Sequence, residues 1–247
     1  MAIWNDPQPT QTGFGASSRM NLDAARAANY DAGERRYMLS IYNYMASAVL
    51  LSGIVALVFA SSGLAAQVFA TPLRWLLILA PLGFVFALSA GFNRMATSTL
   101  QACFWGFAVV MGLSLSSIFL LYTGESIAVT FFATAGAFAG LSLFGYTTKK
   151  SLSGLGSFLT MAVWGLLITM LIGMFFPVPG LALVISVAGV LIFAGLTAYD
   201  TQQLKMMYGQ VAGTPYEQRV AIMGSLNLYL DFINMFQFLL SLLGDRR

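Results

Sequence analysis

Long runs of apolar residues are the feature that most constrains how this chain can fold. Seven runs of about 20 residues lie near 39–61, 73–93, 99–121, 127–147, 157–176, 180–207 and 219–243. A helix of this length crosses the roughly 30 Å hydrocarbon core of a bilayer. It also satisfies its own backbone hydrogen bonds there, which an irregular segment does not. We therefore predict an all-α integral membrane protein, a bundle of seven transmembrane helices.

The composition supports membrane spans rather than a soluble core. Only 9% of the 247 residues are charged and 58% are hydrophobic, whereas soluble domains carry about 25% charged residues. Residues 1–36 form a polar tail, and we predict a membrane domain at residues 37–247. Within the tail, the stretch from Met20 to Arg36 contains helix formers. It either lies along the membrane surface or is disordered.

The basic residues indicate an orientation. If the N-terminal tail is inside and the loops alternate, nine of the twelve Lys and Arg residues fall on the inner side. Such an excess is typical of the cytoplasmic side, so we predict a cytoplasmic N-terminus. The side of the C-terminus stays open, because Arg246 and Arg247 oppose the rule and the last run either crosses or re-enters. The nine inner residues are Arg19, Arg26, Arg35, Arg36, Arg94, Lys149, Lys150, Lys205 and Arg219.

Several function classes are excluded or disfavoured by what the chain lacks. It has no histidine, and Cys103 is its only cysteine. An imidazole acid or base, a Ser-His-Asp triad, a disulfide within the chain and a zinc cluster are therefore excluded. The basic residues are scattered rather than clustered, so we expect no nucleic-acid partner. We expect no cofactor, and any proton chemistry must use carboxylates.

Asp231 is the only ionisable residue near the middle of an apolar run. A charged side chain there costs about 2.5–3.5 kcal/mol on insertion scales, so an intramembrane carboxylate is a functional candidate by default. Polar residues follow it along one helical face, which must contact other helices or water rather than lipid. The stripe is either functional or a structural hydrogen-bonded seam between helices. Its members are Gly224, Asn227, Asp231, Asn234 and Ser241.

Asp200 lies in the inner half of the sixth run, with Gln203 one turn further on. It is either a charge at the helix end, solvated or paired with Lys205, or a partner of Asp231. The sixth and seventh runs are sequential and antiparallel, so the two carboxyl groups can meet. Two carboxyl groups in contact cannot both be ionised cheaply, and such a pair shares a proton and senses pH without histidine.

Arg94 ends the second run on the inner side. Its guanidinium is either an anchor that follows the orientation rule or a group that competes for the charge of the aspartate pair. Small residues also occur at helix-packing spacing, as in Gly136-xxx-Gly140 and in the series Gly189, Ala194 and Ala198. We expect them to serve packing within the chain rather than dimerisation.

Two strings carry a resemblance to a known family. They are Ala198-Tyr199-Asp200-Thr201-Gln202-Gln203 and Leu228-Tyr229-Leu230-Asp231-Phe232-Ile233-Asn234. Together they resemble the signature of the transmembrane Bax inhibitor motif family, in its bacterial YccA-like branch, and the match extends over about residues 37–244. The Asp-Phe-Ile-Asn string is the specific part, whereas the rest is mostly hydropathy.

The resemblance implies a seven-helix bundle with the last helix central, in the bacterial inner membrane. It also implies a pH-sensitive calcium leak channel gated by a paired-aspartate site that corresponds to Asp200 and Asp231. Those carboxylates would contact calcium transiently, as the transported ion, and Gly91-Phe92-Asn93-Arg94 occupies the place of the arginine latch. Asn227, Asn234 and Gln203 would support the site.

The alternative function is a regulator without transport. Relatives of the YccA-like branch are associated with a membrane AAA protease of the FtsH type, so this protease is a second expected partner, and regulation of a stress or cell-death response belongs to the same alternative. An intramembrane aspartyl protease is disfavoured, because Tyr199 and Leu230 precede the aspartates where a glycine is needed. We therefore expect no enzyme.

Overall fold

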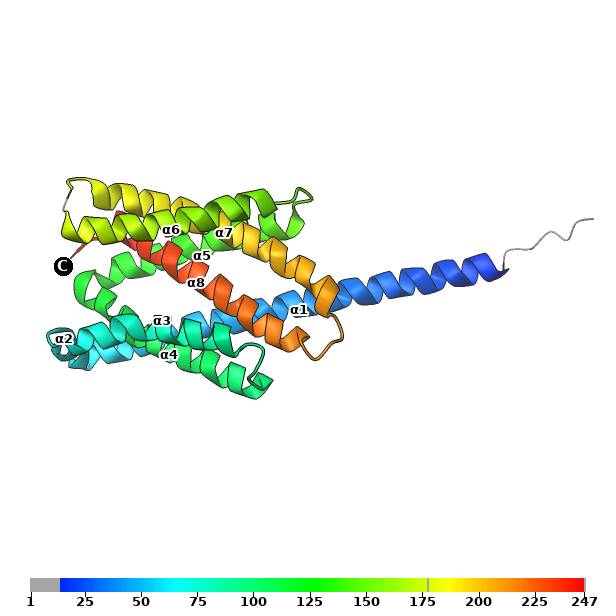
Figure 1. Ribbon diagram of the computed structural model, residues 1–247, viewed down its shortest axis with the longest axis horizontal. Coiled ribbons are helices and arrows are strands. Elements are labelled where there is room, and N and C mark those ends of the chain that lie inside the picture. The colour runs from blue at the N-terminus through cyan, green and yellow to red at the C-terminus, as the bar shows by residue number, and fades with distance from the viewer. Residues whose placement is uncertain (1–13, 177, 247) are drawn as a thin grey trace, which may run out of the picture.

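The computed structural model describes residues 14–176 and 178–246, with side chains from residue 27, and in that part of the chain it is helical apart from short turns (Figure 1). Polar or turn-forming residues end the helices. The Thr123 side chain, for example, accepts a hydrogen bond from the Ser126 backbone N–H at the start of one of them. The helices are α1 (Phe14–Ser61), α2 (Leu64–Phe69), α3 (Leu73–Gly91), α4 (Thr97–Leu121), α5 (Gly124–Thr147), α6 (Ser153–Phe175), α7 (Leu181–Val211) and α8 (Glu217–Leu243).

Seven of these helices are long and apolar enough to cross a membrane, which confirms the predicted number of spans. The predicted runs differ from α3 to α8 by a few residues at each end. α2 is a short helix in the loop between the first two spans. α1 is longer than predicted, because it starts at Phe14 and passes the predicted boundary at residue 36 without a break. It projects from the bundle (Figure 1). Residues 1–13 of the predicted tail lie outside the described residues.

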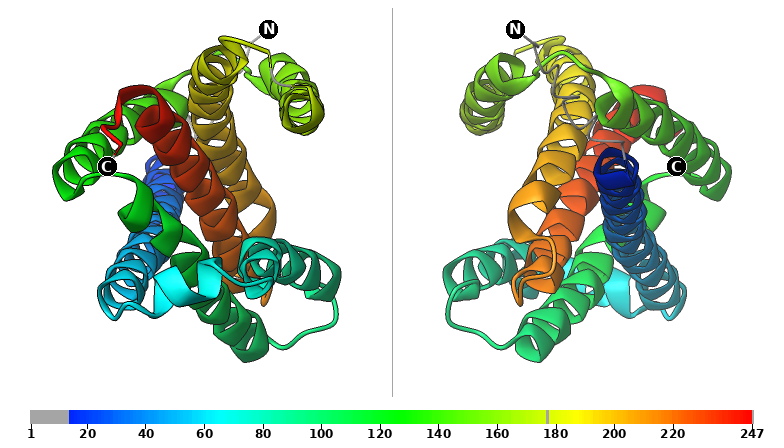
Figure 2. Two further views of the ribbon diagram at one scale, coloured as in Figure 1. Left: turned by 90° about the vertical axis from the view of Figure 1, so that its left-hand side faces the viewer. Right: turned by 90° about the vertical axis from the view of Figure 1, so that its right-hand side faces the viewer.

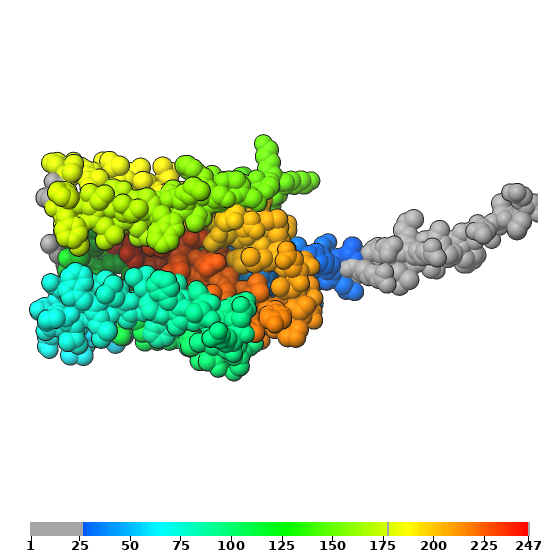
Figure 3. All heavy atoms as spheres, viewed as in Figure 1, coloured from blue at the N-terminus to red at the C-terminus, as the bar shows by residue number. Residues whose placement is uncertain are grey.

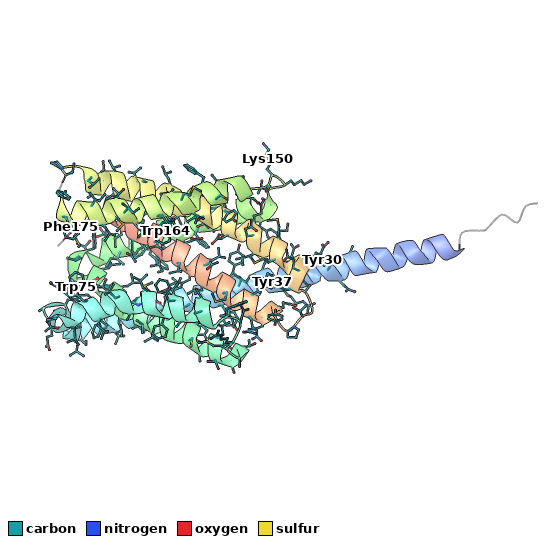
Figure 4. The ribbon with its side chains drawn as sticks, viewed as in Figure 1. Tyr30, Tyr37, Trp75, Lys150, Trp164 and Phe175 are labelled. Atoms are coloured by element: carbon teal, nitrogen blue, oxygen red, sulfur yellow. The ribbon has the colours of Figure 1, made fainter. Side chains whose placement is uncertain are left out.

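Four labelled residues identify the two ends of the bundle (Figure 4). Lys150 and Tyr30 lie at the end from which α1 projects, whereas Trp75 and Phe175 lie at the opposite end (Figure 4). We name them the inner and the outer end, after the predicted orientation. The chain ends at the outer end, where the Thr123 N–H donates to the Asp245 carbonyl at 3.1 Å. α8 therefore crosses the whole bundle rather than re-entering it.

α8 is the central helix of the bundle. Half of its most apolar stretch is buried, against at most 28% in the other spans. It packs against α1, α4, α5 and α7. Seen along the bundle, it runs between α1 and α5 on one side and α6 and α7 on the other (Figure 2). The expectation of a central last helix is confirmed.

A buried polar contact joins three helices inside this apolar core. The Ser52 hydroxyl of α1 donates to the Ala108 carbonyl of α4 at 2.7 Å. The Ser52 hydroxyl also shares a 2.7 Å hydrogen bond with the Tyr229 hydroxyl of α8. Since buried polar groups are stable only when they are paired, these bonds fix α1, α4 and α8 in one register.

At the inner end, side chains of α7 bind the neighbouring helices. The Gln202 amide accepts from the Leu152 N–H at 2.8 Å and donates to the Lys150 carbonyl at 2.9 Å, so it holds the turn between α5 and α6. The Lys205 ammonium donates to the Tyr146 carbonyl at 3.0 Å and lies 3.8 Å from the Glu34 carboxylate. Polar bonds thus tie α1, α5 and α7 together at this end.

The small residues pack as expected only in part. Gly145 of α5 lies against the Ala198 backbone of α7, and Gly189 lies against the Phe238 ring. Gly136 and Gly140, in contrast, are exposed, and no atom lies within 4 Å of where their Cβ would be. The expected packing of this glycine pair within the chain is therefore wrong. The spacing alone does not reveal which face of α5 meets α7.

We predict that Gly145→Ala destabilises the bundle and that Gly136→Ala does not. A methyl group at Gly145 would meet backbone atoms that cannot move aside, and such overpacking costs about 1–3 kcal/mol. At Gly136 the same change meets open space and gains helix propensity of about 0.5–1 kcal/mol. The temperature of half-unfolding in detergent should fall for the first variant and stay equal or rise for the second. Equal stability of the two variants would contradict the close contact of α5 and α7.

Candidate functional site

Close packing of α7 on α8 positions the predicted site. Gly224 of α8 has no side chain, so Leu204 of α7 rests directly on its backbone. Near the outer end, the Ser186 hydroxyl of α7 donates to the Ser241 hydroxyl of α8 at 3.0 Å. These two contacts fix the antiparallel register of the two helices.

The register brings the two predicted aspartates together. Asp200 of α7 lies opposite the residues that follow Gly224 on α8. Along the helix pair, Asp200 is therefore about one helical turn from Asp231. One turn of an α-helix rises about 5.4 Å, so the two aspartates lie in the same region of the contact between α7 and α8. Asp231 is only 5% exposed, and its Oδ2 is buried with no hydrogen-bond partner among the described residues. The site therefore holds a carboxyl group that the surrounding helices do not satisfy.

Asp200 is half-buried in the wall of a cavity of about 560 Å³ near the inner end. The cavity lies between the end of α3, the inner half of α7 and the first half of α8. The predicted supporting residues Gln203 and Asn227 line it as well. Its further lining residues are Ser89, Phe92, Tyr199, Leu204, Met207, Val220, Met223 and Gly224.

A second cavity, of about 620 Å³, lies between α6, α7 and α8 toward the outer end. The polar residues that line it are Ser186, Asn234, Gln237 and Ser241. Of these, the predicted Asn234 donates its amide to the Leu230 carbonyl of its own helix at 2.8 Å. Among the described residues, its side chain has no hydrogen-bond partner on a neighbouring helix.

The polar stripe of α8 connects the two cavities. Asn227 lines the inner cavity, Asn234 and Ser241 line the outer one, and Asp231 lies between them and lines neither. α8 is visible at the floor of a hollow between α6 and α3 (Figure 3). The seam interpretation fits Ser241, which bonds to α7. The seam interpretation does not fit Asp231. Asn227 is exposed and needs water, because lipid cannot form hydrogen bonds with its amide.

The basic residues considered for this site do not pair with it in this arrangement. Lys205 is engaged with Glu34 and lies 4.3 Å from the centre of the Tyr146 ring. Arg94 is exposed in the turn between α3 and α4, and its side chain makes no ion pair with a described acidic residue. The structure thus brings Asp200, Asp231, Gln203 and Asn227 into one region and leaves Arg94 at its margin.

The two carboxylates do not form a ligand set for a resident metal ion. Among the described residues there is no group of three or more His, Cys, Asp or Glu side chains arranged to hold one. Two carboxyl groups beside amide oxygens can contact a hard cation such as calcium, which prefers six to eight oxygen ligands.

Comparison with known proteins now identifies the family. The family model for Inhibitor of apoptosis-promoting Bax1 matches residues 34–247, which include α3 to α8 and most of α1. The chain belongs to this Bax inhibitor family. The match confirms the family that the two aspartate strings indicated.

Full-length relatives occur in several bacteria. A protein of Caulobacter vibrioides is 45% identical over 250 residues, which cover 95% of this chain and 98% of the relative. A protein of Rickettsia prowazekii is 42% identical over 88% of this chain and 93% of its own length. The inner membrane protein YbhL of Escherichia coli is 41% identical over 87% of this chain and 94% of its own length.

Arg219 is a residue of this Bax inhibitor family protein that sequence reasoning treated only as an orientation marker. Its guanidinium, on the first turn of α8, donates to the Met95 carbonyl at 2.8 Å and to the Phe92 carbonyl. It lies 5.4 Å from the centre of the Phe92 ring and 5.5 Å from that of Tyr216. Arg219 thus fastens the turn between α3 and α4 to α8, beside the inner cavity. The predicted topology placed Arg219 and Arg94 on the same side of the membrane but gave no signal of this contact.

We predict that Arg219→Gln loosens this turn. Hydrogen bonds from a charged donor are worth about 1.5–3 kcal/mol, and a lysine cannot replace the planar guanidinium that contacts both carbonyls. Hydrogen–deuterium exchange of residues 92–96 should rise in Arg219→Gln and, to a smaller extent, in Arg219→Lys. Arg94→Gln, a charge loss in the same turn, is the matched control. Equal exchange in Arg219→Gln and Arg94→Gln would show that the contact does not hold the turn.

Proposed function

We propose that this protein is a pH-sensitive leak pathway for calcium or a similar cation, gated at the carboxyl pair Asp200 and Asp231. The observation that carries the proposal is the buried carboxyl group of Asp231, which lies between two cavities on one polar stripe. Carboxyl groups in membrane helices are costly and mark ion pathways. The stripe leads from the inner cavity past Asp231 to the outer one.

The charges beside this path favour cations. Among the described residues, no Lys or Arg lines either of the two cavities, whereas Asp200 and amide side chains do. A path lined in this way attracts cations and repels anions. Calcium is proposed here as the transported ion rather than as a resident cofactor.

Asp231 supplies the gate in this proposal. When it is protonated, the carboxyl group is neutral and fits the dry contact between α7 and α8. When it is ionised, an unpaired charge in that contact is costly, so water and a cation are drawn in from the two cavities. Raising the pH ionises the pair and increases flux, and lowering the pH neutralises it and decreases flux.

Arg94 is the proposed latch in a second arrangement of the helices. Phe92, two residues before it, lines the same inner cavity as Asp200. A shift of the turn between α3 and α4 would bring the guanidinium to the Asp200 carboxylate, with which it forms a strong hydrogen-bonded pair. Arg219 opposes this shift, because it holds the same turn on α8.

The bacterial inner membrane is the proposed location, with the N-terminus in the cytoplasm. Seven apolar helices and the inner-membrane relative YbhL of Escherichia coli support this membrane. The excess of Lys and Arg on the inner side supports the orientation.

We predict that Asp231→Asn abolishes the pH dependence of calcium flux. Asparagine resembles the protonated carboxyl group and cannot ionise, so flux into sealed proteoliposomes should stay low at every pH. Asp200→Asn should weaken the dependence, because one carboxyl group of the pair remains. Glu125→Gln removes an exposed carboxylate at the outer end and is the matched control, with a wild-type profile expected. A wild-type profile in Asp231→Asn would refute the gate, and no flux above empty liposomes would refute the leak.

A second candidate function is regulation of a membrane AAA protease of the FtsH type. The projection of α1 beyond the bundle favours it, because a helix free of the bundle is available to a partner (Figure 1). In this case the membrane domain would anchor the regulatory helix, and no ion flux would be needed.

Deletion of residues 1–26 separates the two functions. It keeps the part of α1 that packs in the bundle, including Tyr30, which contacts Tyr208. If the leak is the function, calcium flux and its pH profile should be unchanged. If regulation is the function, the protein should lose its effect on the degradation rate of a membrane substrate by the co-reconstituted protease. Loss of pH-dependent flux on deletion would contradict the gate as placed here.

A further inference from the structure

A groove of about 790 Å³ is lined mainly by residues of α1 and α5. These two helices lie on the side of the bundle away from α6 (Figure 2). Both helices pack on α8, and Phe232 of α8 forms part of the groove lining. The lining is almost entirely apolar and contains large, adaptable side chains. It includes Met38, Leu39, Met45 and Leu50 from α1 and Phe131 and Leu143 from α5.

The inner end of the groove differs from the rest, because it carries a positive charge. Arg35 lines it and is exposed. The neighbouring Glu34 carboxylate is already engaged, since it accepts a hydrogen bond from the Tyr146 hydroxyl at 2.9 Å and pairs with Lys205. Asp31, one turn earlier, is the other nearby acidic group. Among the described residues neither carboxylate forms an ion pair with Arg35, so its guanidinium can bind an anion at the mouth of the apolar groove.

The length of the groove matches one leaflet of a bilayer. Its lining on α1 extends from Arg35 to Leu50, which corresponds to about 22 Å along a helix. Half of a bilayer's hydrocarbon core is about 15 Å thick, and the headgroup region adds several ångströms. The Arg35 guanidinium thus lies at headgroup depth when Leu50 and Phe232 lie near the midplane.

We propose that this groove is a binding site for an anionic phospholipid of the inner leaflet. The Arg35 guanidinium binds the headgroup phosphate through its planar pair of N–H donors. One acyl chain fills the groove between α1 and α5 and reaches Phe232. The Tyr42 and Tyr146 side chains, which also line the groove, contribute amphipathic walls.

The proposed site is separate from the ion path but shares α8 with it. Phe232 lines the lipid groove, whereas its neighbour Asp231 does not. The acyl chain therefore lies between α1 and α5 and against α8, near the level of the carboxyl pair. The inference does not depend on ion transport, and a lipid bound to a protein without flux would still support it.

The experiment measures lipid retention by native mass spectrometry of protein purified from bilayers of phosphatidylglycerol and phosphatidylethanolamine in equal amounts. We expect wild type to retain phosphatidylglycerol preferentially. Arg35→Gln should reduce its retention at least about five-fold, because the variant loses the direct guanidinium contact with the phosphate as well as one positive charge. Arg36→Gln, the matched control, removes the adjacent exposed charge, which lines a different cavity, and should leave retention unchanged.

A second pair of variants tests the groove rather than the charge. Ala46 is exposed and lines the groove, and Ser47 is exposed beside it without lining it. Ala46→Trp should fill the groove and reduce retention of both lipids, whereas Ser47→Trp should not. Equal loss in Arg35→Gln and Arg36→Gln would mean general attraction to the membrane surface and would overturn the site. Retention unchanged in Arg35→Gln and Ala46→Trp, or a polypeptide in place of the lipid, would overturn it as well.

Discussion

The direct contact of α7 with α8 is the interaction on which the rest of the structure depends. It exists because Gly224 leaves the backbone of α8 open to Leu204. The contact fixes the register that brings Asp200 to Asp231, and it keeps lipid and water away from the deeper carboxyl group. A larger residue at Gly224 would separate the helices and expose the pair. The burial of the carboxyl pair thus follows from the close packing that Gly224 permits.

How much the sequence predicts depends on whether a property is set locally. The seven spans follow from hydropathy, because a run of apolar residues has to be long enough to cross the bilayer. Asp231 is recognisable for the same reason, as a charge in an apolar run. The side on which a helix packs is set by its neighbours, so Gly136 and Gly140 were expected to be buried but are exposed.

The role of Arg219 and the groove between α1 and α5 lay beyond sequence reasoning for a related reason. Arg219 contacts carbonyl groups more than 120 residues earlier in the chain, and no local pattern signals a bond to a backbone oxygen. The groove exists because α1 and α5 both pack on the tilted α8 without filling the space between them. Both features are consequences of assembly around one central helix.

The distribution of polar contacts between helices suggests how such a bundle changes shape. At the inner end, Gln202, Lys205 and Arg219 each bind a neighbouring helix or turn. At the outer end, a 3.0 Å bond from the Asp245 N–H to the Ser126 hydroxyl joins the chain terminus to the start of α5, and the bond from Ser186 to Ser241 joins α7 to α8. Among these three inner contacts, only the one made by Arg219 holds the turn that follows α3. Since α3 is among the least buried spans, release of that one contact would free a wall of the inner cavity and leave the core of α1, α4 and α8 intact.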